Sequence, residues 1–205
     1  MTIERLIFDA AGALRYPVLV LALVSLCVVL VEAGMFAVEV VRRRRRDTAR
    51  LECIAQTARS ALEAGDVAGA RVALLQVASS AAMAAALELI AERVSAPGGA
   101  ERVAKGLADF DFGSLRRLER TRILVRGGPA LGLMGTLIPL APALAGLAEG
   151  DIGQLSRNLR VAFSITVLGL LVGAAAFAMS LVRDRLYAQD LSDLEFVVAT
   201  IEASA

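Results

Sequence analysis

Long runs of apolar residues, separated by charged segments, dominate the pattern of this chain. Residues 16–41 carry only two charged side chains, and residues 127–148 and 161–182 carry none. A helix of roughly 20 apolar residues crosses about 30 Å of hydrocarbon. The pattern therefore predicts an all-α membrane protein with three transmembrane helices, at residues 16–41, 123–148 and 159–182.

The second and third predicted spans form a hairpin. The segment between them, residues 149–158, is short and polar, with Glu149, Asp151 and Arg157 as its charges. A link of this length only turns the chain back, so we expect the two spans to pack side by side.

Two basic clusters orient the predicted spans. Five consecutive arginines occupy residues 42–46, and a second group follows at Arg116, Arg117, Arg120, Arg122 and Arg126. Arginine flanking a span marks its cytoplasmic side, which predicts an outside N-terminus and an inside C-terminus. Arg157 and Arg160 oppose this orientation. The second cluster could instead bind RNA, but its position beside a span favours a topological role and no nucleic-acid partner.

The remaining segments are predicted to be helical and to lie in water. Residues 1–15, outside the membrane, form either a short amphipathic surface helix or a frayed tail. Residues 42–122 form a cytoplasmic helical insert, interrupted at Gly65-Asp66 and by a turn at residues 95–99. Residues 183–205 form a cytoplasmic tail with a short C-terminal helix, whose apolar stripe is Leu191, Leu194, Val198 and Ile201.

Composition argues against catalysis and cofactor binding. Of the 205 residues, 57% are apolar, the mean hydropathy is +0.65, and the net charge is only +1. The chain has no histidine, and its two cysteines, Cys27 and Cys53, are too few to hold zinc. No phosphate-binding loop or nucleophile motif is present. We therefore expect no enzyme, no cofactor and no metal site.

Two glutamates lie within the first predicted span and share a helix face, because Glu32 and Glu39 are seven residues apart. Glu39 is one turn before Arg43, so an ion pair near the membrane surface explains it. Glu32 lies deeper, where a carboxylate needs a partner, water or its proton. Glu32 is thus a candidate intramembrane carboxylate with either a structural or a functional role.

Small residues form a stripe on each helix of the hairpin. Gly128, Gly132 and Thr136 are four apart in the second span. The stripe of the third span contains Ala162, Thr166, Gly169, Gly173 and Ala176. Small residues allow close helix contact in lipid. We therefore assign helix packing to the glycines Gly128, Gly132, Gly135, Gly169 and Gly173.

The hairpin also contains hydroxyls and prolines. Thr136 and Thr166 lie on the small-residue stripes, where each either bonds to its own helix or serves a polar pathway. Pro139 and Pro142 are expected to kink or widen the second span, which leaves carbonyls in need of partners or water. This favours a helix that lines a hydrated space.

These motifs resemble the MotA/TolQ/ExbB proton-channel family. Pro129-Ala-Leu-Gly-Leu-Met-Gly-Thr136 is similar to the family pattern Pro-x-x-Gly-Leu-x-Gly-Thr, and Ala162 to Gly169 to Ala-Leu-x-x-Thr-x-x-Gly. Gly150-Asp151 lies where the family often has Gly-Asp in its external link, and Gly65-Asp66 with the following Ala/Leu-rich helix is typical of its insert. The three-span layout resembles the ExbB/TolQ branch.

The resemblance implies a homopentamer in the cytoplasmic (inner) membrane. Its pore would be lined by the second and third spans and would hold single-span ExbD/TolR-like partners, with an intramembrane aspartate as proton carrier. Thr136 and Thr166 would then be pore residues on the proton path. Such a stator-like subunit uses the proton gradient to drive transport, including protein transport, or envelope work.

The sequence also departs from the family pattern. Val161 stands where the third span often begins with glutamate, and Pro139 replaces a small residue after Gly-Thr. These departures favour an alternative, a non-conducting membrane scaffold that assembles partner proteins. A membrane enzyme is a distant third, because no catalytic constellation is present.

Overall fold

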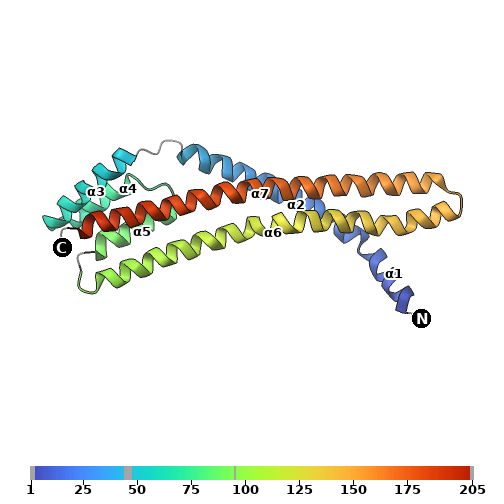
Figure 1. The fold of residues 1–205 in the computed structure, drawn as a ribbon, viewed down its shortest axis with the longest axis horizontal. Helices are drawn as coiled ribbons and strands as arrows, with labels where there is room; N and C mark the ends of the chain where they lie inside the picture. Colours follow the sequence, from blue (N-terminus) through green and yellow to red (C-terminus); the bar gives the residue numbers. More distant parts are fainter. Residues whose placement is uncertain (1–2, 44–47, 95, 204–205) are drawn as a thin grey trace. The chain divides into compact units, whose positions relative to one another are not determined.

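The computed structural model describes residues 3–43, 48–94 and 96–203, and every regular element within them is an α-helix (Figure 1). Residues 44–46 of the arginine block, Ser95 of the predicted turn and the last two residues of the tail lie outside the described residues. The helices are α1 (Ile3–Ala13), α2 (Arg15–Arg43), α3 (Thr48–Glu63), α4 (Val67–Leu75), α5 (Ala81–Arg93), α6 (Gly99–Ala148) and α7 (Ile152–Glu202). They form two compact units, Met1–Phe36 with Glu119–Leu181, and Ala37–Leu118 with Val182–Ala205.

Three helices are long and apolar enough to cross a membrane, which confirms the predicted all-α, three-span fold. They are Leu6–Val41, Gly99–Ala148 and Ile152–Glu202. Two of these continue well beyond the predicted spans, because helix hydrogen bonds are local and do not stop where apolar composition ends. The orientation of the spans stays a prediction.

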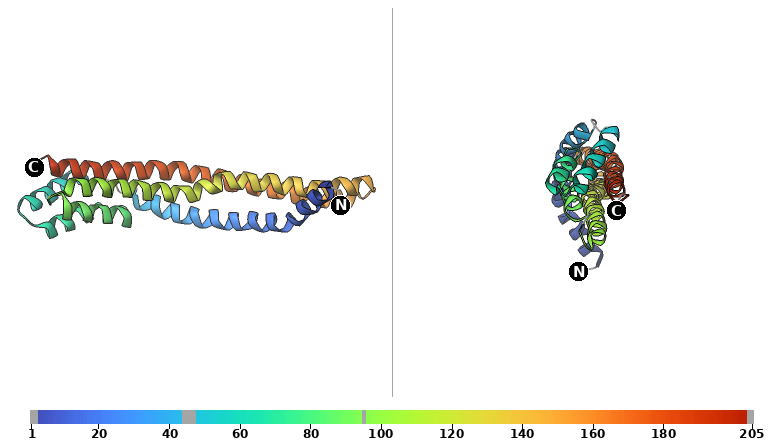
Figure 2. Two further views of the ribbon diagram at one scale, coloured as in Figure 1. Left: turned by 90° about the horizontal axis from the view of Figure 1, so that it is seen from below. Right: turned by 90° about the vertical axis from the view of Figure 1, so that its left-hand side faces the viewer.

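The first unit is built on the hairpin of α6 and α7. The two helices run antiparallel and side by side in this unit, joined by a short turn (Figures 1 and 2). Helix α2 packs against them through Val29, which is buried beside Val172, Ala176 and Met179. Outward-facing side chains of α6 such as Leu133, Leu137 and Leu144 stay exposed, as expected for a surface that contacts lipid.

A glycine and an aspartate make the hairpin turn. Gly150 has φ +80°, a left-handed conformation that disfavours residues with a Cβ atom. The Asp151 N–H donates to the carbonyl of Gly146 (2.8 Å), which closes the end of α6. The Asp151 carboxylate then accepts from the Gln154 N–H (2.8 Å) and caps α7. Gly150 thus allows α6 to end, and Asp151 caps the start of α7.

The same chemistry recurs at the break between α3 and α4. Gly65 has φ +79°, and the Asp66 carboxylate accepts from the Gly69 N–H at 2.8 Å. The predicted interruption at Gly65-Asp66 is therefore confirmed. A second cap, Ser80, starts α5 by accepting from the Met83 N–H. The segment from Val67 to Val94 is thus two helices rather than one.

The second unit buries the apolar faces of α3, α4 and α5 against the N-terminal part of α6 and the C-terminal part of α7. Fully buried members of this core include Leu74, Leu87 and Val103. From α7, Leu194, Val198 and Ile201 are buried and Leu191 packs at the edge, so the predicted apolar stripe of the tail is confirmed. The C-terminal helix is not separate, because α7 continues from the third span without a break.

Candidate functional site

A seam of glycines joins α6 and α7 at close range in the first unit. A Cβ atom added at Gly128 would lie 2.7 Å from the Gly169 carbonyl oxygen. A Cβ atom added at Gly169 would lie 2.5 Å from the Gly128 carbonyl oxygen. Both distances are shorter than a carbon can approach an oxygen, so only glycine fits at these two positions.

Three further glycines extend this seam along both helices. An added Cβ atom at Gly173 would meet the ring of Pro129 at 2.7 Å, and one at Gly135 would meet the Ile165 side chain at 2.3 Å. At Gly132 an added Cβ atom would lie 3.4 Å from the Thr166 Cα, in van der Waals contact with the facing helix. All five glycines assigned to helix packing therefore face the partner helix of the hairpin.

Thr166 lies in the seam, opposite Gly132. Its hydroxyl donates to the Ala162 carbonyl (3.0 Å) and lies 3.5 Å from the Gly132 carbonyl of the facing helix. Thr136 is one turn along α6 from Gly132, and its hydroxyl donates to the Leu133 carbonyl at 2.7 Å. Both hydroxyls thus bond to carbonyls of their own helix. Each oxygen can still accept a hydrogen bond from a group outside the hairpin.

The prolines do not interrupt α6. Pro129, Pro139 and Pro142 all lie within one continuous helix. Gln154 of α7 donates to the Pro142 carbonyl (3.4 Å), which satisfies one acceptor near the external end. Pro139 is buried beside Val18 of α2, around a cavity of only about 10 Å³. The expected kink or widening stays a prediction.

Glu32 lies on α2 in the first unit and is partly buried. Glu32 makes at least one interaction. Near the opposite end of this unit, the Arg15 guanidinium donates to the side-chain oxygen of Asn158, a buried residue of α7 (3.3 Å). The polar groups of this unit therefore lie on α2 as well as on the hairpin.

The second unit contains a buried cluster of charges that the sequence only partly revealed. Arg43 contacts Glu39 at 3.1 Å, which confirms the ion pair expected one turn apart on α2. Arg43 also contacts Asp190 at 2.9 Å, and Arg183 contacts Glu39 at 3.4 Å. Within the described contacts, two guanidiniums and two carboxylates therefore belong to one network between α2 and α7.

Burial distinguishes this network from the surface ion pairs. The side chains of Arg43, Arg183 and Asp190 are 7%, 8% and 6% exposed. Ser79 donates a hydrogen bond to the other oxygen of the Asp190 carboxylate at 3.1 Å. Such burial is costly unless charges are paired and hydrogen-bonded, so each member depends on the others.

Tyr187 of α7 packs against this network. The Arg43 guanidinium carbon lies 5.5 Å from the centre of its ring, within cation–π range. Burial raises the pKa of the Tyr187 phenol above its usual 10.0, and the Glu39 carboxylate raises it further. The nearby arginines oppose both effects without reversing them.

Sequence reasoning missed Asp190 and Arg183 as partners of α2 because the contacts are long-range. A signal exists, however. Residues 183, 187, 190, 194 and 201 share one face of α7, and three of them are buried apolar or aromatic residues. Charged residues on an otherwise buried stripe indicate charges with partners.

Nothing in the described part of the chain adds a metal site, since no three His, Cys, Asp or Glu side chains converge.

The sequence profile of the MotA/TolQ/ExbB proton channel family matches residues 113–195, about two-fifths of the chain. This range includes the whole glycine seam, Thr136, Thr166, Arg183 and Asp190. A search of curated proteins found no match.

Proposed function

We propose that this protein, whose residues 113–195 match the MotA/TolQ/ExbB proton channel family, is a stator-like channel subunit of the cytoplasmic membrane. It harnesses the proton gradient together with a single-span ExbD/TolR-like partner to drive transport or envelope work. As in the sequence interpretation, copies of the chain form a ring, a homopentamer, around the partner helices.

The observation that carries this proposal is the placement of Thr166 within an uncharged hairpin. Residues 127–148 and 161–182 contain no ionisable side chain, so the hairpin alone supplies no proton carrier. Thr166 nevertheless offers a hydroxyl at the glycine seam, half-buried and held by the Ala162 carbonyl. A hydroxyl in such a span suits a carboxyl group brought by another chain.

The proposed chemistry depends on the two protonation states of the partner carboxyl. A protonated carboxyl donates a hydrogen bond to the Oγ1 of Thr136 or Thr166. An ionised carboxylate instead requires donors, which the same hydroxyls supply by turning away from Leu133 and Ala162. Low dielectric favours the neutral form, so proton uptake from outside precedes passage through the apolar hairpin and release to the cytoplasm.

The test is to replace each hydroxyl while keeping its volume. Thr136→Val and Thr166→Val, separately and together, are reconstituted with the partner in vesicles, and proton flux is followed with an entrapped pH dye. The matched control is Thr57→Val, because Thr57 also bonds to its own helix, to the Cys53 carbonyl at 2.8 Å. We expect lower flux in the hairpin variants only; unchanged flux would refute the role assigned to both threonines.

A non-conducting scaffold is the second candidate. It is favoured by the two threonine hydroxyls, which are already satisfied by Leu133 and Ala162, and by Val161 at the position where the family often has glutamate. Co-purification with the product of the neighbouring gene, followed by the proton-flux measurement on the purified complex, separates the two functions. A ring around partner helices that passes no protons would indicate the scaffold.

A further inference from the structure

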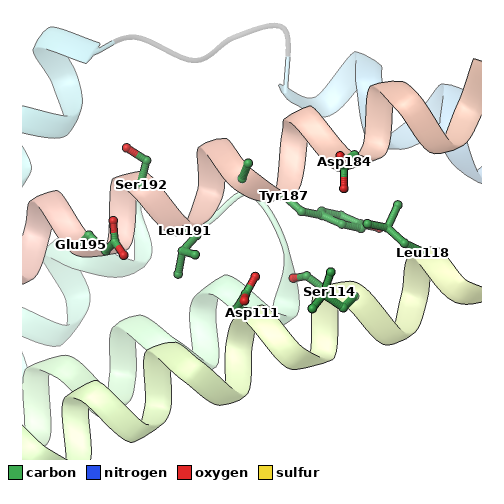
Figure 3. Close-up of a pocket in the computed structure, with 10 residues that line it drawn as sticks. Asp111, Ser114, Leu118, Asp184, Tyr187, Leu191, Ser192 and Glu195 are labelled. Atoms are coloured by element: carbon green, nitrogen blue, oxygen red, sulfur yellow. The ribbon is translucent and has the colours of Figure 1, made fainter.

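A groove lies between α6 and α7 in the second unit (Figure 3). Its volume is about 170 Å³. Asp111 points from α6 toward α7, while Tyr187 and Leu191 point from α7 toward α6. The residues of its lining that matter here are Asp111, Leu118, Asp184, Tyr187, Leu191 and Glu195.

The groove has an acidic rim and a mostly apolar floor. Asp111, Asp184 and Glu195 are exposed at the rim, and none of the lining residues is basic. On the floor, Leu118 is fully buried and Tyr187 is 9% exposed. Within the described residues the Tyr187 hydroxyl makes no hydrogen bond, and its side chain extends across the groove. The groove therefore offers negative charge together with an aromatic ring and an unused hydroxyl.

These properties match one long cationic side chain. Small-molecule sites usually measure about 300–1,000 Å³, so this groove is too small for most metabolites. Its carboxylates do not converge as metal ligands would. An arginine fits this combination, because its stem packs on apolar residues and its N–H groups reach the carboxylates of the rim.

A second copy of this chain can supply that arginine. Arg116 is exposed on α6 and makes no ion pair or hydrogen bond within the described residues. It follows Ser114 by two positions, about 200° around the helix, so it faces away from the groove of its own chain. In the sequence of α6 it nevertheless lies between Asp111 and Leu118, which line the groove, so Arg116 is level with the groove along the helix axis.

Ring symmetry makes this arrangement significant. In copies related by rotation about one axis, a given residue has the same height along that axis in every copy. A ring also requires two different, complementary patches on each copy. The groove and Arg116 are such a pair, because they lie at one level on different faces. Resting on the ring proposed above, we infer that Arg116 of each copy inserts into the groove of the next, between Asp111 and Glu195.

Cysteine cross-linking tests the contact directly in the full chain with its partner in membranes. Cys27 and Cys53 are first replaced by alanine. Arg116→Cys and Glu195→Cys are then combined in one chain and treated with a short bis-maleimide. We expect a ladder of linked copies from the double variant and none from either single variant. Arg102→Cys with Glu195→Cys is the control, because Arg102 is equally exposed on α6.

Charge reversal gives an independent readout. We expect Arg116→Glu to lower the amount of assembled ring at least tenfold on dilution, Asp111→Arg combined with it to restore assembly, and Arg102→Glu to change nothing. A ring that conducts protons but shows no 116–195 ladder would overturn this contact and leave the channel intact. A chain that stays monomeric under every condition would overturn the proposed ring as well.

Discussion

Arg43 and Asp190, which are far apart in the sequence, form a buried ion pair of 2.9 Å in the second unit. Each is more than nine-tenths buried, and each has a further partner, Glu39 and Ser79 respectively. The pair holds the end of α2 against α7. The stability of this unit therefore depends on charges that no local pattern brings together.

Removing one charge of this network should be strongly destabilising. Asp190→Asn removes one of the two described ion-pair partners of the buried Arg43 guanidinium, and breaking a buried pair costs about 3–5 kcal/mol. We expect amide hydrogen exchange in residues 182–203 to accelerate by more than a hundredfold, on the scale of tenfold per 1.4 kcal/mol.

The matched experiment removes both charges together. Arg43→Leu with Asp190→Leu leaves Glu39 and Arg183 as a neutral pair, so it should cost much less than Asp190→Asn alone. Equal losses in the two variants would show that packing, rather than charge, holds α2 to α7.

The glycine seam should not tolerate a methyl group. Gly169→Ala places a carbon 2.5 Å from the Gly128 carbonyl oxygen, and relief of such overpacking costs about 1–3 kcal/mol. Gly127→Ala is the control, because nothing lies within 4 Å of its added carbon. Heating the detergent-purified protein and measuring the fraction that stays monodisperse should show a lower midpoint for Gly169→Ala only.

The hairpin turn should depend on its aspartate cap. Asp151→Ala removes the acceptor of the Gln154 N–H and should cost about 0.5–2 kcal/mol. Asp151→Asn keeps a side-chain oxygen in the same place and should be close to neutral. Thermal midpoints measured at neutral pH distinguish these outcomes, and an equally damaging asparagine would point to the charge instead of the cap.

Tyr187 should make the second unit sensitive to high pH. Its pKa is raised in the folded protein by burial and by Glu39, so the folded state holds the phenolic proton more tightly than the unfolded state. The resulting stability is complete below pH 10 and is lost as pH rises through the folded pKa. In a Tyr16→Phe background, the titration of Tyr187 followed by tyrosinate absorbance should have its midpoint above pH 10. Tyr187→Phe should remove the part of the alkaline loss in unfolding free energy that this phenol causes.

Local chemistry made part of this molecule predictable from sequence. The three spans follow from uninterrupted apolar length, and the hairpin follows from the short polar link between two of them. The break at Gly65-Asp66 follows from the interrupted helical pattern, and the Glu39–Arg43 pair from spacing along one helix. Each of these signals lies within a few residues of its effect.

The rest depends on contacts between distant segments. Asp190 lies in the predicted tail, and only its position on the buried face of α7 indicates a partner. The groove is equally hidden, since Asp111 and Glu195 meet only after α6 and α7 pack together. Hydropathy marks the lipid boundary and not the end of a helix, so it does not show that α6 runs without a break from Gly99 to Ala148.

The burial of the Arg43–Asp190 network also determines how the protein should respond to ionic strength. Dissolved ions screen exposed charges over a Debye length of about 8 Å at 0.15 M salt, but they hardly reach buried pairs. The internal network should therefore survive concentrated salt, whereas a contact between the exposed Arg116 and acidic rims should weaken. Salt should thus separate neighbouring copies before it unfolds any one of them.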